Sequence, residues 1–424
     1  MPGHAQPPTG ATGTTSDASG AAGAGGGDTV AHWIALVDAL YPEGDAEGWD
    51  STGLQVGDPA APVTRVLISL DVTEAVLAEA AEMGAQLVLA HHPLLFRPLD
   101  RLTPSTAPGR LALRAARQGI ALLAAHTNVD VAPEGTTDPV MQALGITDAV
   151  PLVPSPPAQL VKLVTFVPPA DTDAVLEALS HAGAGRIGEY EECSFRVAGT
   201  GTFRPSAAAD PAVGERGVRN AVAEDRLEVV LPRPRLAAAI AALRGAHPYE
   251  EVAFDVVPLL PEGQEAGGQE GSGKGLGRVG TVPEALSLRE VCDLLAIGLP
   301  ARHLRVAGDL DAPVRRVAAC GGAGDSLLAA ARSAGAEVYV TGDLRHHVAL
   351  DALTLGLPVI DAGHHATEAP AMAVVLERLT AAAAHRGLTA GVLASAVRTE
   401  PWADYRPPAS GAGPVSRNRG EGSR

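Results

Sequence analysis

Residues Val88–Phe96, which read VLAHHPLLF, combine an apolar run with two adjacent histidines and a proline. The apolar part predicts a buried β-strand, and neighbouring side chains of a strand point to opposite faces. Pro93 stiffens the exit of this strand, so His91 and His92 can present their imidazoles in diverging directions. That arrangement suits two metal ions better than one. A structural pair that hydrogen-bonds locally or lies at the surface is the alternative interpretation.

Strand and helix patterns alternate on both sides of this stretch. Apolar runs predict strands at 63–70, 86–90 and 120–125, and apolar residues at helical spacing predict helices at 29–40, 72–84 and 106–118. Asp28 is a candidate cap for the first helix. The alternation is typical of a parallel α/β sheet, whose ligands gather beyond the carboxyl ends of the strands. The His91-His92 pair and the segment His126–Asp130 both follow such ends, which favours a metal site.

A different pattern begins after a Pro-rich junction at 151–157 and ends in a Gly-rich segment at 261–275. Between these borders we expect the order strand, helix, strand, strand, helix, strand, at 160–167, 172–182, 195–203, 227–231, 235–243 and 252–257. This βαββαβ order predicts a small ferredoxin-like α+β module. Proline and glycine at both borders indicate an inserted domain rather than one member of a linear array.

The alternation of strands and helices resumes after Gly277. Strands are expected at 314–319, 338–341 and 357–361, and a long helix is expected to continue through about residue 384. The glycine-rich stretch Cys320–Gly324 predicts a turn before a helix at Ser326, with close packing of the backbone favoured over ligand binding. The last two strands run into Gly342–His347 and Ala362–Glu368, which carry further histidines and carboxylates.

Five side chains at these strand ends carry donor atoms that metals bind: His91, His92, Asp130, His364 and Glu368. His364 and Glu368 are four residues apart at an expected helix start, so both can reach one ion. Imidazole and carboxylate donors without thiolates suit Zn²⁺, Mn²⁺, Fe²⁺ or Co²⁺. Five protein ligands cannot fill all the coordination positions of two ions, so positions for water remain. A carboxylate that bridges the two ions is the natural arrangement, and a bridging water would have a lowered pKa. These features predict hydrolase-type chemistry.

Each candidate also has a structural interpretation. His364 with Glu368 could form a helix-capping pair, Asp130 could cap the following turn, and His126 could hydrogen-bond locally. His347 could lie at the surface, but we favour a role in orienting ligands or substrate. We therefore assign His126 and His347 assisting catalytic roles. The joint placement of such residues at four separate strand ends favours the metal site.

Six stretches form a specific combination of motifs: Trp49–Gly57, Ser69–Thr73, His91–Leu94, His126–Asp130, Gly342–His347 and Asp361–Glu368. Together they resemble the Nif-three-like dinuclear metal centre family, whose members are often labelled GTP cyclohydrolase I type 2 homologues. The resemblance covers roughly residues 29–150 and 275–395. Ser51 stands where the family pattern has Asn, and His346 stands where Tyr is usual, which puts substrate contacts at His346 in doubt.

The resemblance implies two similar α/β halves around an interdomain cleft that holds two divalent metal ions per subunit. It places the metal ligands on the five residues named above. The segment His247–Glu251, with Asp255 and Pro258, resembles the end of the extra domain found in longer family members. Since the family assembles as a hexameric toroid, a homohexamer is expected here.

Composition excludes several classes of protein. The net charge of −17 over 424 residues argues against a broad phosphate-binding face, so a nucleic-acid partner is not expected. Three widely spaced cysteines indicate buried reduced thiols rather than disulfides or a thiolate zinc site. The sequence has neither a membrane-spanning apolar run nor a secretory signal, which predicts a cytoplasmic protein.

These patterns predict an α/β protein with three folded units: an N-terminal half at 29–155, the inserted domain at 158–262 and a C-terminal half at 277–403. Disordered tails are expected at 1–28 and 404–424, and a flexible linker at 263–276. The favoured function is a metal-dependent hydrolase that acts on a small, nucleotide-like molecule. The alternative is a non-catalytic, metal-binding hexameric ring that serves as a metallochaperone or as an interaction and regulatory scaffold.

Overall fold

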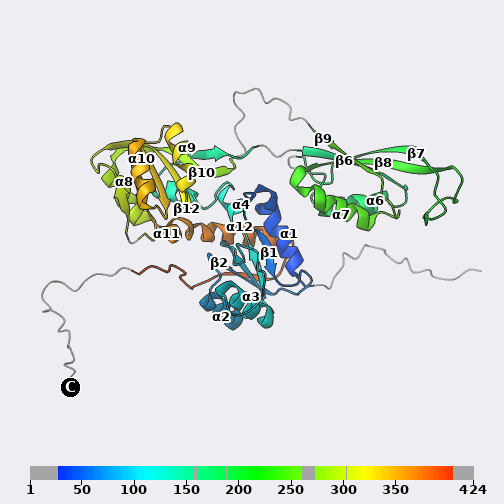
Figure 1. The fold of residues 1–424 in the computed structure, drawn as a ribbon, viewed down its shortest axis with the longest axis horizontal. Helices are drawn as coiled ribbons and strands as arrows, with labels where there is room; N and C mark the ends of the chain where they lie inside the picture. The colour runs from blue at the N-terminus through cyan, green and yellow to red at the C-terminus, as the bar shows by residue number, and fades with distance from the viewer. Residues whose placement is uncertain (1–26, 157–159, 188–189, 260–272, 302, 404–424) are drawn as a thin grey trace, which may run out of the picture.

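The computed structural model describes residues 27–156, 160–187, 190–259, 273–301 and 303–403. Most of the tail expected at 1–28, most of the linker expected at 263–276 and all of the tail expected at 404–424 lie outside these residues. The described chain is a mixed α/β structure built on three separate sheets. In Figure 1 the second sheet lies at the left and the third at the right, with the first sheet below and between them.

The first sheet has five strands in the order β1-β4-β3-β2-β15. Its strands are β1 (Gly53–Val56), β2 (Arg65–Ser69), β3 (Leu87–Ala90), β4 (Ala121–Ala124) and β15 (Gly391–Ala394). All neighbouring pairs are parallel except β1 with β4, which is antiparallel. The central strands β2, β3 and β4 confirm the parallel α/β pattern expected from the sequence.

Two pairs of helices cover the first sheet, one pair on each face (Figure 1). These helices are α1 (Val30–Leu40), α2 (Glu74–Met83), α3 (Ala107–Gln118) and α12 (Ala371–His385). Leu87 and Leu89 of β3 pack toward α1 and α12, whereas Val88 packs toward α2 and α3. Both faces of the strand are therefore buried, as its continuous apolar run requires.

The second sheet has six strands in the order β11-β14-β13-β12-β10-β5. Its strands are β5 (Val150–Pro154), β10 (Gly275–Ser287), β11 (Arg305–Ala307), β12 (Pro313–Ala323), β13 (Val338–Gly342) and β14 (Val359–Asp361). The three central strands β12, β13 and β14 are parallel, whereas β11 pairs antiparallel with β14, β10 with β12, and β5 with β10. Its helices are α5 (Asp138–Ala143) and α8 (Leu288–Gly298) on one face, and α9 (Leu328–Ser333) and α10 (His346–Thr354) on the other.

The glycine stretch after Cys320 differs from its prediction. Strand β12 continues through Ala323, so the turn expected there is wrong. A register shift between Ala319 and Ala323 interrupts the pairing of β12 with β13, and Gly322 has a φ of 63°. The chain thus stays extended but bends where the glycines allow it.

The third sheet is antiparallel, with the strand order β7-β8-β6-β9. Its elements are β6 (Leu160–Val167), α6 (Thr172–His181), β7 (Ser194–Phe203), β8 (Asn220–Pro232), α7 (Leu236–Ala246) and β9 (Phe254–Pro258). Both helices pack on the sheet through one apolar cluster. The elements follow one another in the order expected from the sequence.

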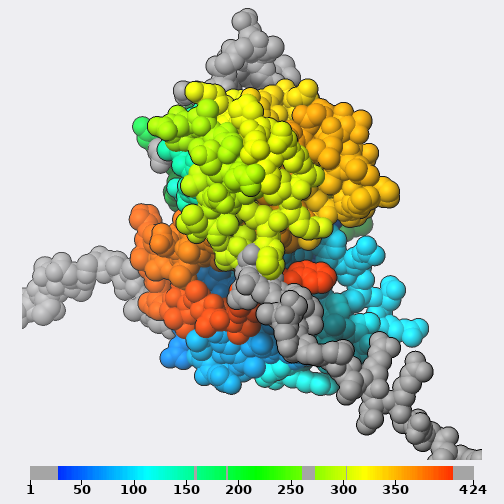
Figure 2. Space-filling model, turned by 90° about the vertical axis from the view of Figure 1, so that its left-hand side faces the viewer, coloured from blue at the N-terminus to red at the C-terminus, as the bar shows by residue number. Residues whose placement is uncertain are grey.

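The chain passes between the first and second sheets more than once. Strand β5 lies at the edge of the second sheet, where it pairs with β10. Helix α12 and strand β15 return to the first sheet, and Figure 2 shows this orange-to-red segment lying with the blue N-terminal segment. None of the helices in the described ranges is long and apolar enough to cross a membrane.

Candidate metal centre

The predicted metal ligands lie at the carboxyl ends of parallel strands from two different sheets. His91 and His92 directly follow β3, and Asp130 ends the short helix α4 (Thr127–Asp130) that follows β4. His364 and Glu368 are the first and last residues of helix α11 (His364–Glu368), which follows β14. The structure therefore brings all five residues together, as the strand-end argument predicted.

Glu368 lies at the middle of this cluster. Its Oε2 is 2.9 Å from His92 Nε2 and 3.1 Å from His364 Nε2. Its Oε1 is 3.9 Å from His91 Nε2, which is itself 3.5 Å from Asp130 Oδ1. Glu368 thus belongs to two groups of potential metal ligands, one with His92 and His364 and the other with His91 and Asp130.

In each of the three predicted histidine ligands, the other ring nitrogen, Nδ1, contacts a hydrogen-bond acceptor. His91 Nδ1 is 3.0 Å from the carbonyl oxygen of Ala125, His92 Nδ1 is 2.8 Å from Asp71 Oδ1, and His364 Nδ1 is 2.8 Å from Asp343 Oδ2. A carbonyl or carboxylate oxygen can only accept a hydrogen bond, so each Nδ1 donates its N–H. In the neutral rings each Nε2 therefore carries a lone pair that points into the cluster.

With these rings neutral, the cluster gathers acceptors without matching donors. His91 Nε2 and Glu368 Oε2 are buried and have no hydrogen-bond partner among the described residues. The close contacts of Glu368 Oε2 with His92 and His364 lack hydrogen-bond geometry, and the Nε2 atoms of those two rings are only 3.2 Å apart. Unpaired buried acceptors are costly, and a cation between them removes the cost. The donor set therefore fits a divalent metal.

When no metal is bound, protons on two of the histidine rings offset part of the negative charge of the cluster. Burial opposes a charge on His92, but its contacts with Asp71 and Glu368 outweigh burial and raise its pKa to about 10. Contacts with Glu368 and Asp343 likewise overcome burial and raise the pKa of His364 to about 9. His91 behaves differently because burial dominates, lowering its pKa to about 3. A metal ion would compete with protons at His92 and His364 but not at His91.

The two carboxylates of the cluster, Asp130 and Glu368, have pKa values that shift in opposite directions. Burial and the negative charge of Glu368 raise the pKa of Asp130 to about 7. Burial acts against the charge on Glu368, yet its contacts with His364 and His92 hold the pKa of that carboxyl below its usual range. Glu368 is therefore the carboxylate that stays charged in the metal-free protein.

Two glycines let the backbone approach this cluster. A Cβ placed on Gly322 would lie 2.0 Å from Glu368 Oε1 and 3.2 Å from His364 Nε2. A Cβ on Gly342 would lie 2.6 Å from the backbone nitrogen of His364. The close packing predicted for the glycine stretch is confirmed at Gly322, and what packs there is the side chain of Glu368.

His126 lies beside the five predicted ligands. Its ring centroid is 5.1 Å from that of His91 and 5.6 Å from that of His92, and the three histidines form a further group with metal-ligand spacing. His126 Nδ1 is 2.8 Å from Asp50 Oδ1, and Thr127 donates two hydrogen bonds to Asp50 Oδ2. His126 is thus oriented so that its Nε2 faces the cluster.

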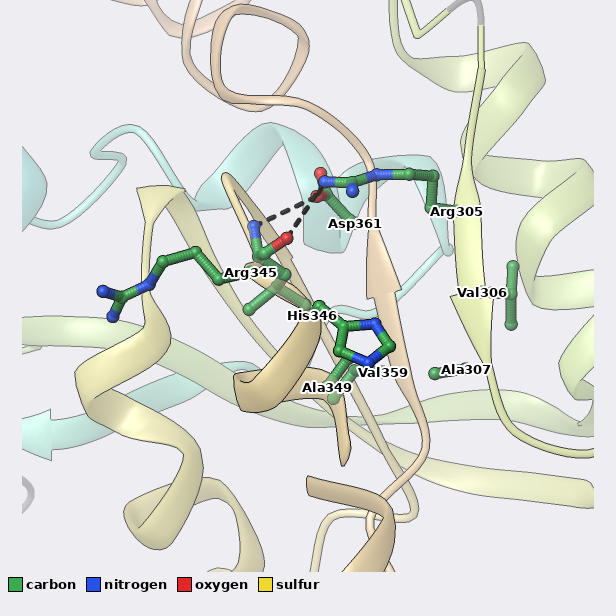
Figure 3. Close-up of a pocket in the computed structure, with 9 residues that line it drawn as sticks. Arg305, Val306, Ala307, Arg345, His346, Ala349, Val359 and Asp361 are labelled. Carbon is green, nitrogen blue, oxygen red and sulfur yellow. Dashed lines mark hydrogen bonds and ion pairs between the residues drawn. The ribbon is translucent and has the colours of Figure 1, made fainter. Parts of the chain in front are cut away.

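His347 lies apart from these groups. It is an exposed residue of the first turn of α10, and its ring contacts His346 at 5.2 Å. None of the three ligand groups found among the described residues contains it. Its neighbour His346 lines a cavity of about 210 Å³ with Arg305 and Asp361, and Figure 3 shows the Arg305 side chain paired with Asp361. The assisting role assigned to His347 stays a prediction.

The carboxylates that orient the histidines were not predicted from the sequence. Asp71 follows β2 and Asp343 follows β13, so both lie at the strand ends where the ligands lie. Asp343 has a φ of 55°, which is uncommon for a residue other than glycine. Both residues belong to motifs of the family resemblance, Ser69–Thr73 and Gly342–His347, and their position at strand ends was the signal that could have identified them.

Comparison with known proteins agrees with this geometry. The family model described as Duf34/NIF3 (NGG1p interacting factor 3) matches residues 29–401. The chain belongs to the Duf34/NIF3 family. A Mycobacterium tuberculosis relative named GTP cyclohydrolase 1 type 2 homolog is 42% identical over 377 residues, which cover 88% of this chain and 96% of the relative. A relative of the same name from Halalkalibacterium halodurans is 39% identical over 369 residues, covering 87% and 97%.

Solved structures also share this fold. A Bacillus cereus protein related to NIF3 has a TM-score of 0.63 at 38% identity, covering 89% of this chain and 99% of that one. The Staphylococcus aureus protein SA1388 has the same TM-score at 27% identity and the same coverage. The resemblance stated from the motifs is confirmed at the level of the family.

Proposed function

We propose that this Duf34/NIF3 protein binds two divalent metal ions and uses them to hydrolyse a small, nucleotide-like molecule. The observation that carries the proposal is the position of Glu368, which belongs to two ligand groups at once. A carboxylate shared in this way serves two ions. His92 and His364 would hold one ion, His91 and Asp130 would hold the other, and Glu368 would contribute to both.

The chemistry follows from the donor set. Bound divalent ions of the Zn²⁺, Mn²⁺, Fe²⁺ or Co²⁺ type activate water for hydrolysis near neutral pH. Asp71, Asp343 and the Ala125 carbonyl each accept a hydrogen bond from Nδ1, which leaves the Nε2 atoms of the three imidazoles free to bind a metal. We assign assisting roles to His126, whose ring is held by Asp50, in proton transfer at Nε2, and to His347 in contacts with substrate. The nucleotide-like substrate is suggested by the names of the relatives.

Elemental analysis of the purified chain tests the metal part of the proposal. We expect about two divalent ions per chain, and Glu368→Ala should remove both because each ion loses a ligand. Glu377→Ala, which removes an exposed glutamate of α12, is the matched control and should keep both ions. Loss of a single ion in Glu368→Ala would show that the carboxylate serves one site only.

A screen of nucleotides and phosphoesters tests the catalytic part. The metal-loaded protein should hydrolyse at least one compound, and His91→Ala should abolish that activity. Two bound ions without any turnover would contradict the hydrolase. That result would support the metal-binding scaffold or metallochaperone instead.

The same proposal extends to the architecture. We propose that the first and second sheets form two similar halves with the metal centre in the cleft between them, and that the third sheet is an inserted ferredoxin-like domain. We further propose a cytoplasmic homohexamer. Light scattering after size-exclusion chromatography tests the assembly, since a hexamer has six times the chain mass of 43.0 kDa.

A further inference from the structure

An aromatic-walled cavity of about 440 Å³ lies next to the candidate metal centre. Trp49 and Phe96 form two of its walls, with ring centroids 5.9 Å apart and an angle of 68° between the rings. Leu54, Leu95 and Leu99 supply aliphatic surface. The volume is in the range that small-molecule sites occupy.

Both of these rings are exposed to solvent, side by side. Aromatic residues make up only 3% of the sequence, and two of them, Trp49 and Phe96, lie at this one cavity, 61% and 45% exposed. Large apolar side chains gain free energy by leaving water. The exposure of two large apolar side chains at one cavity therefore indicates a ligand that covers them when it binds.

His126 connects this cavity to the metal ligands. Its ring centroid is 6.3 Å from Trp49 and 6.4 Å from Phe96. On its other side the same ring is 5.1 Å from His91 and 5.6 Å from His92. A molecule that contacts Trp49 and Phe96 can therefore extend past a single imidazole to the metal ligands.

Hydrogen bonds fix the two walls relative to each other. The Gln55 side chain accepts from the backbone N–H of Leu95 at 2.9 Å and donates to the carbonyl oxygen of Ser51 at 2.9 Å. Ser51 Oγ donates to the carbonyl oxygen of Leu95 at 2.9 Å. The loop that carries Phe96 is thus tied to the segment that carries Trp49, so the cavity exists before any ligand arrives.

The lining also indicates which part of a substrate fits. The residues that form the cavity include no lysine and no arginine, and their single carboxylate, Asp50, is already bound to His126 and Thr127. Such a lining does not attract a phosphate. Flat aromatic faces instead favour stacking with a planar ring.

We propose that the cavity between Trp49 and Phe96 binds the planar heterocyclic ring of the substrate, as a nucleobase would be bound. The assignment to substrate rests on the proposed function of the metal centre. Ring binding itself depends on Trp49 and Phe96 and does not require a metal, so the two proposals can fail separately.

Titration calorimetry of the full chain, with and without bound metal, tests the cavity. The probes are guanosine, adenosine and uridine, with ribose as the ringless control. We expect at least one nucleoside to bind more tightly than ribose. Trp49→Ala and Phe96→Ala should each weaken that binding about tenfold, or about 1.4 kcal/mol, whereas Trp49→Phe should retain most of it. Phe195→Ala, on an exposed phenylalanine of the third sheet, should change nothing.

The outcomes separate the two proposals. Nucleosides that bind no better than ribose, or alanine variants that bind like the parent, overturn the ring site even when two metal ions are present. Nucleoside binding that depends on Trp49 and Phe96 in a chain that takes up no metal supports the ring site and overturns the metal proposal.

Discussion

Single carboxylates outside the ligand set decide how the histidines face the cluster. Asp71 holds His92 Nδ1 at 2.8 Å, so Asp71→Ala removes the contact that keeps Nε2 turned toward Glu368. We expect metal affinity to fall about 10- to 100-fold, as measured by competition with a chelating dye. Asp173→Ala, which breaks an exposed pair with Arg196, should leave metal affinity unchanged.

A substitution at Gly322 tests whether the close approach of the backbone to Glu368 is needed for metal binding. An added Cβ would meet Glu368 Oε1 at 2.0 Å, so Gly322→Ala should displace that carboxylate and lose metal. Gly356→Ala is the matched control, because Gly356 has a similar positive φ of 69° and nothing within 4 Å of the added atom. Both variants should lose about 1 kcal/mol of stability from the backbone strain, but only Gly322→Ala should lose metal in elemental analysis. Equal metal content in both would contradict the contact.

Proton release should accompany metal binding. With pKa values of about 10 for His92 and about 9 for His364, both rings carry a displaceable proton at neutral pH in the metal-free protein. Metal affinity should therefore rise with pH until about pH 9 to 10 and weaken as the pH falls. Calorimetry in buffers of different ionisation enthalpy should detect release of at least two protons near pH 7, one from each ring and part of one from Asp130. Affinity that is independent of pH across this range would argue against His92 and His364 as ligands.

At the scale of elements, Asp28 joins the start of the first helix to the last strand. Thr29 occupies the N-cap of α1, so the cap predicted at Asp28 is wrong. Asp28 Oδ2 instead accepts the backbone N–H groups of Thr389 and Ala390, at 2.8 and 2.6 Å, just before β15. Asp28→Ala should cost about 2–4 kcal/mol in urea unfolding, because it leaves two N–H groups without acceptors. Asp58→Ala, at an exposed turn, should cost much less.

The sequence predicted best those elements whose side chains are buried on both faces. Strands β3 and β4 are continuous apolar runs, and their ends located His91, His92 and Asp130. Edge strands such as β1 and β15 were missed, because four residues with one neighbouring strand carry little periodic signal. The glycine stretch in β12 was taken for a turn because glycine usually marks one. Its actual role depends on contact with Glu368, which no local pattern reveals.

Across the whole molecule, one buried arginine links the two sheets that supply ligands. Arg278 of β10 donates to the carbonyl oxygens of Gly275, Gly277 and Ala132 and pairs with Asp138 at 3.1 Å. Arg278→Met should lower the free energy of unfolding by about 3–5 kcal/mol and weaken metal binding, since Ala132 lies two residues from Asp130. Arg289→Met, at an exposed pair with Asp311, is the control for both measurements. A stable Arg278→Met protein with full metal content would contradict this link.

The return of α12 and β15 to the first sheet also constrains the order of events during synthesis. Val375 and Leu379 of α12 cover the face of the sheet that holds Leu87 and Leu89, yet they leave the ribosome almost 300 residues later. Throughout that interval the nascent chain exposes an apolar face and an unpaired edge at β2. His364 and Glu368 emerge just ahead of the segment that closes this face, so a half-made chain cannot assemble the metal centre.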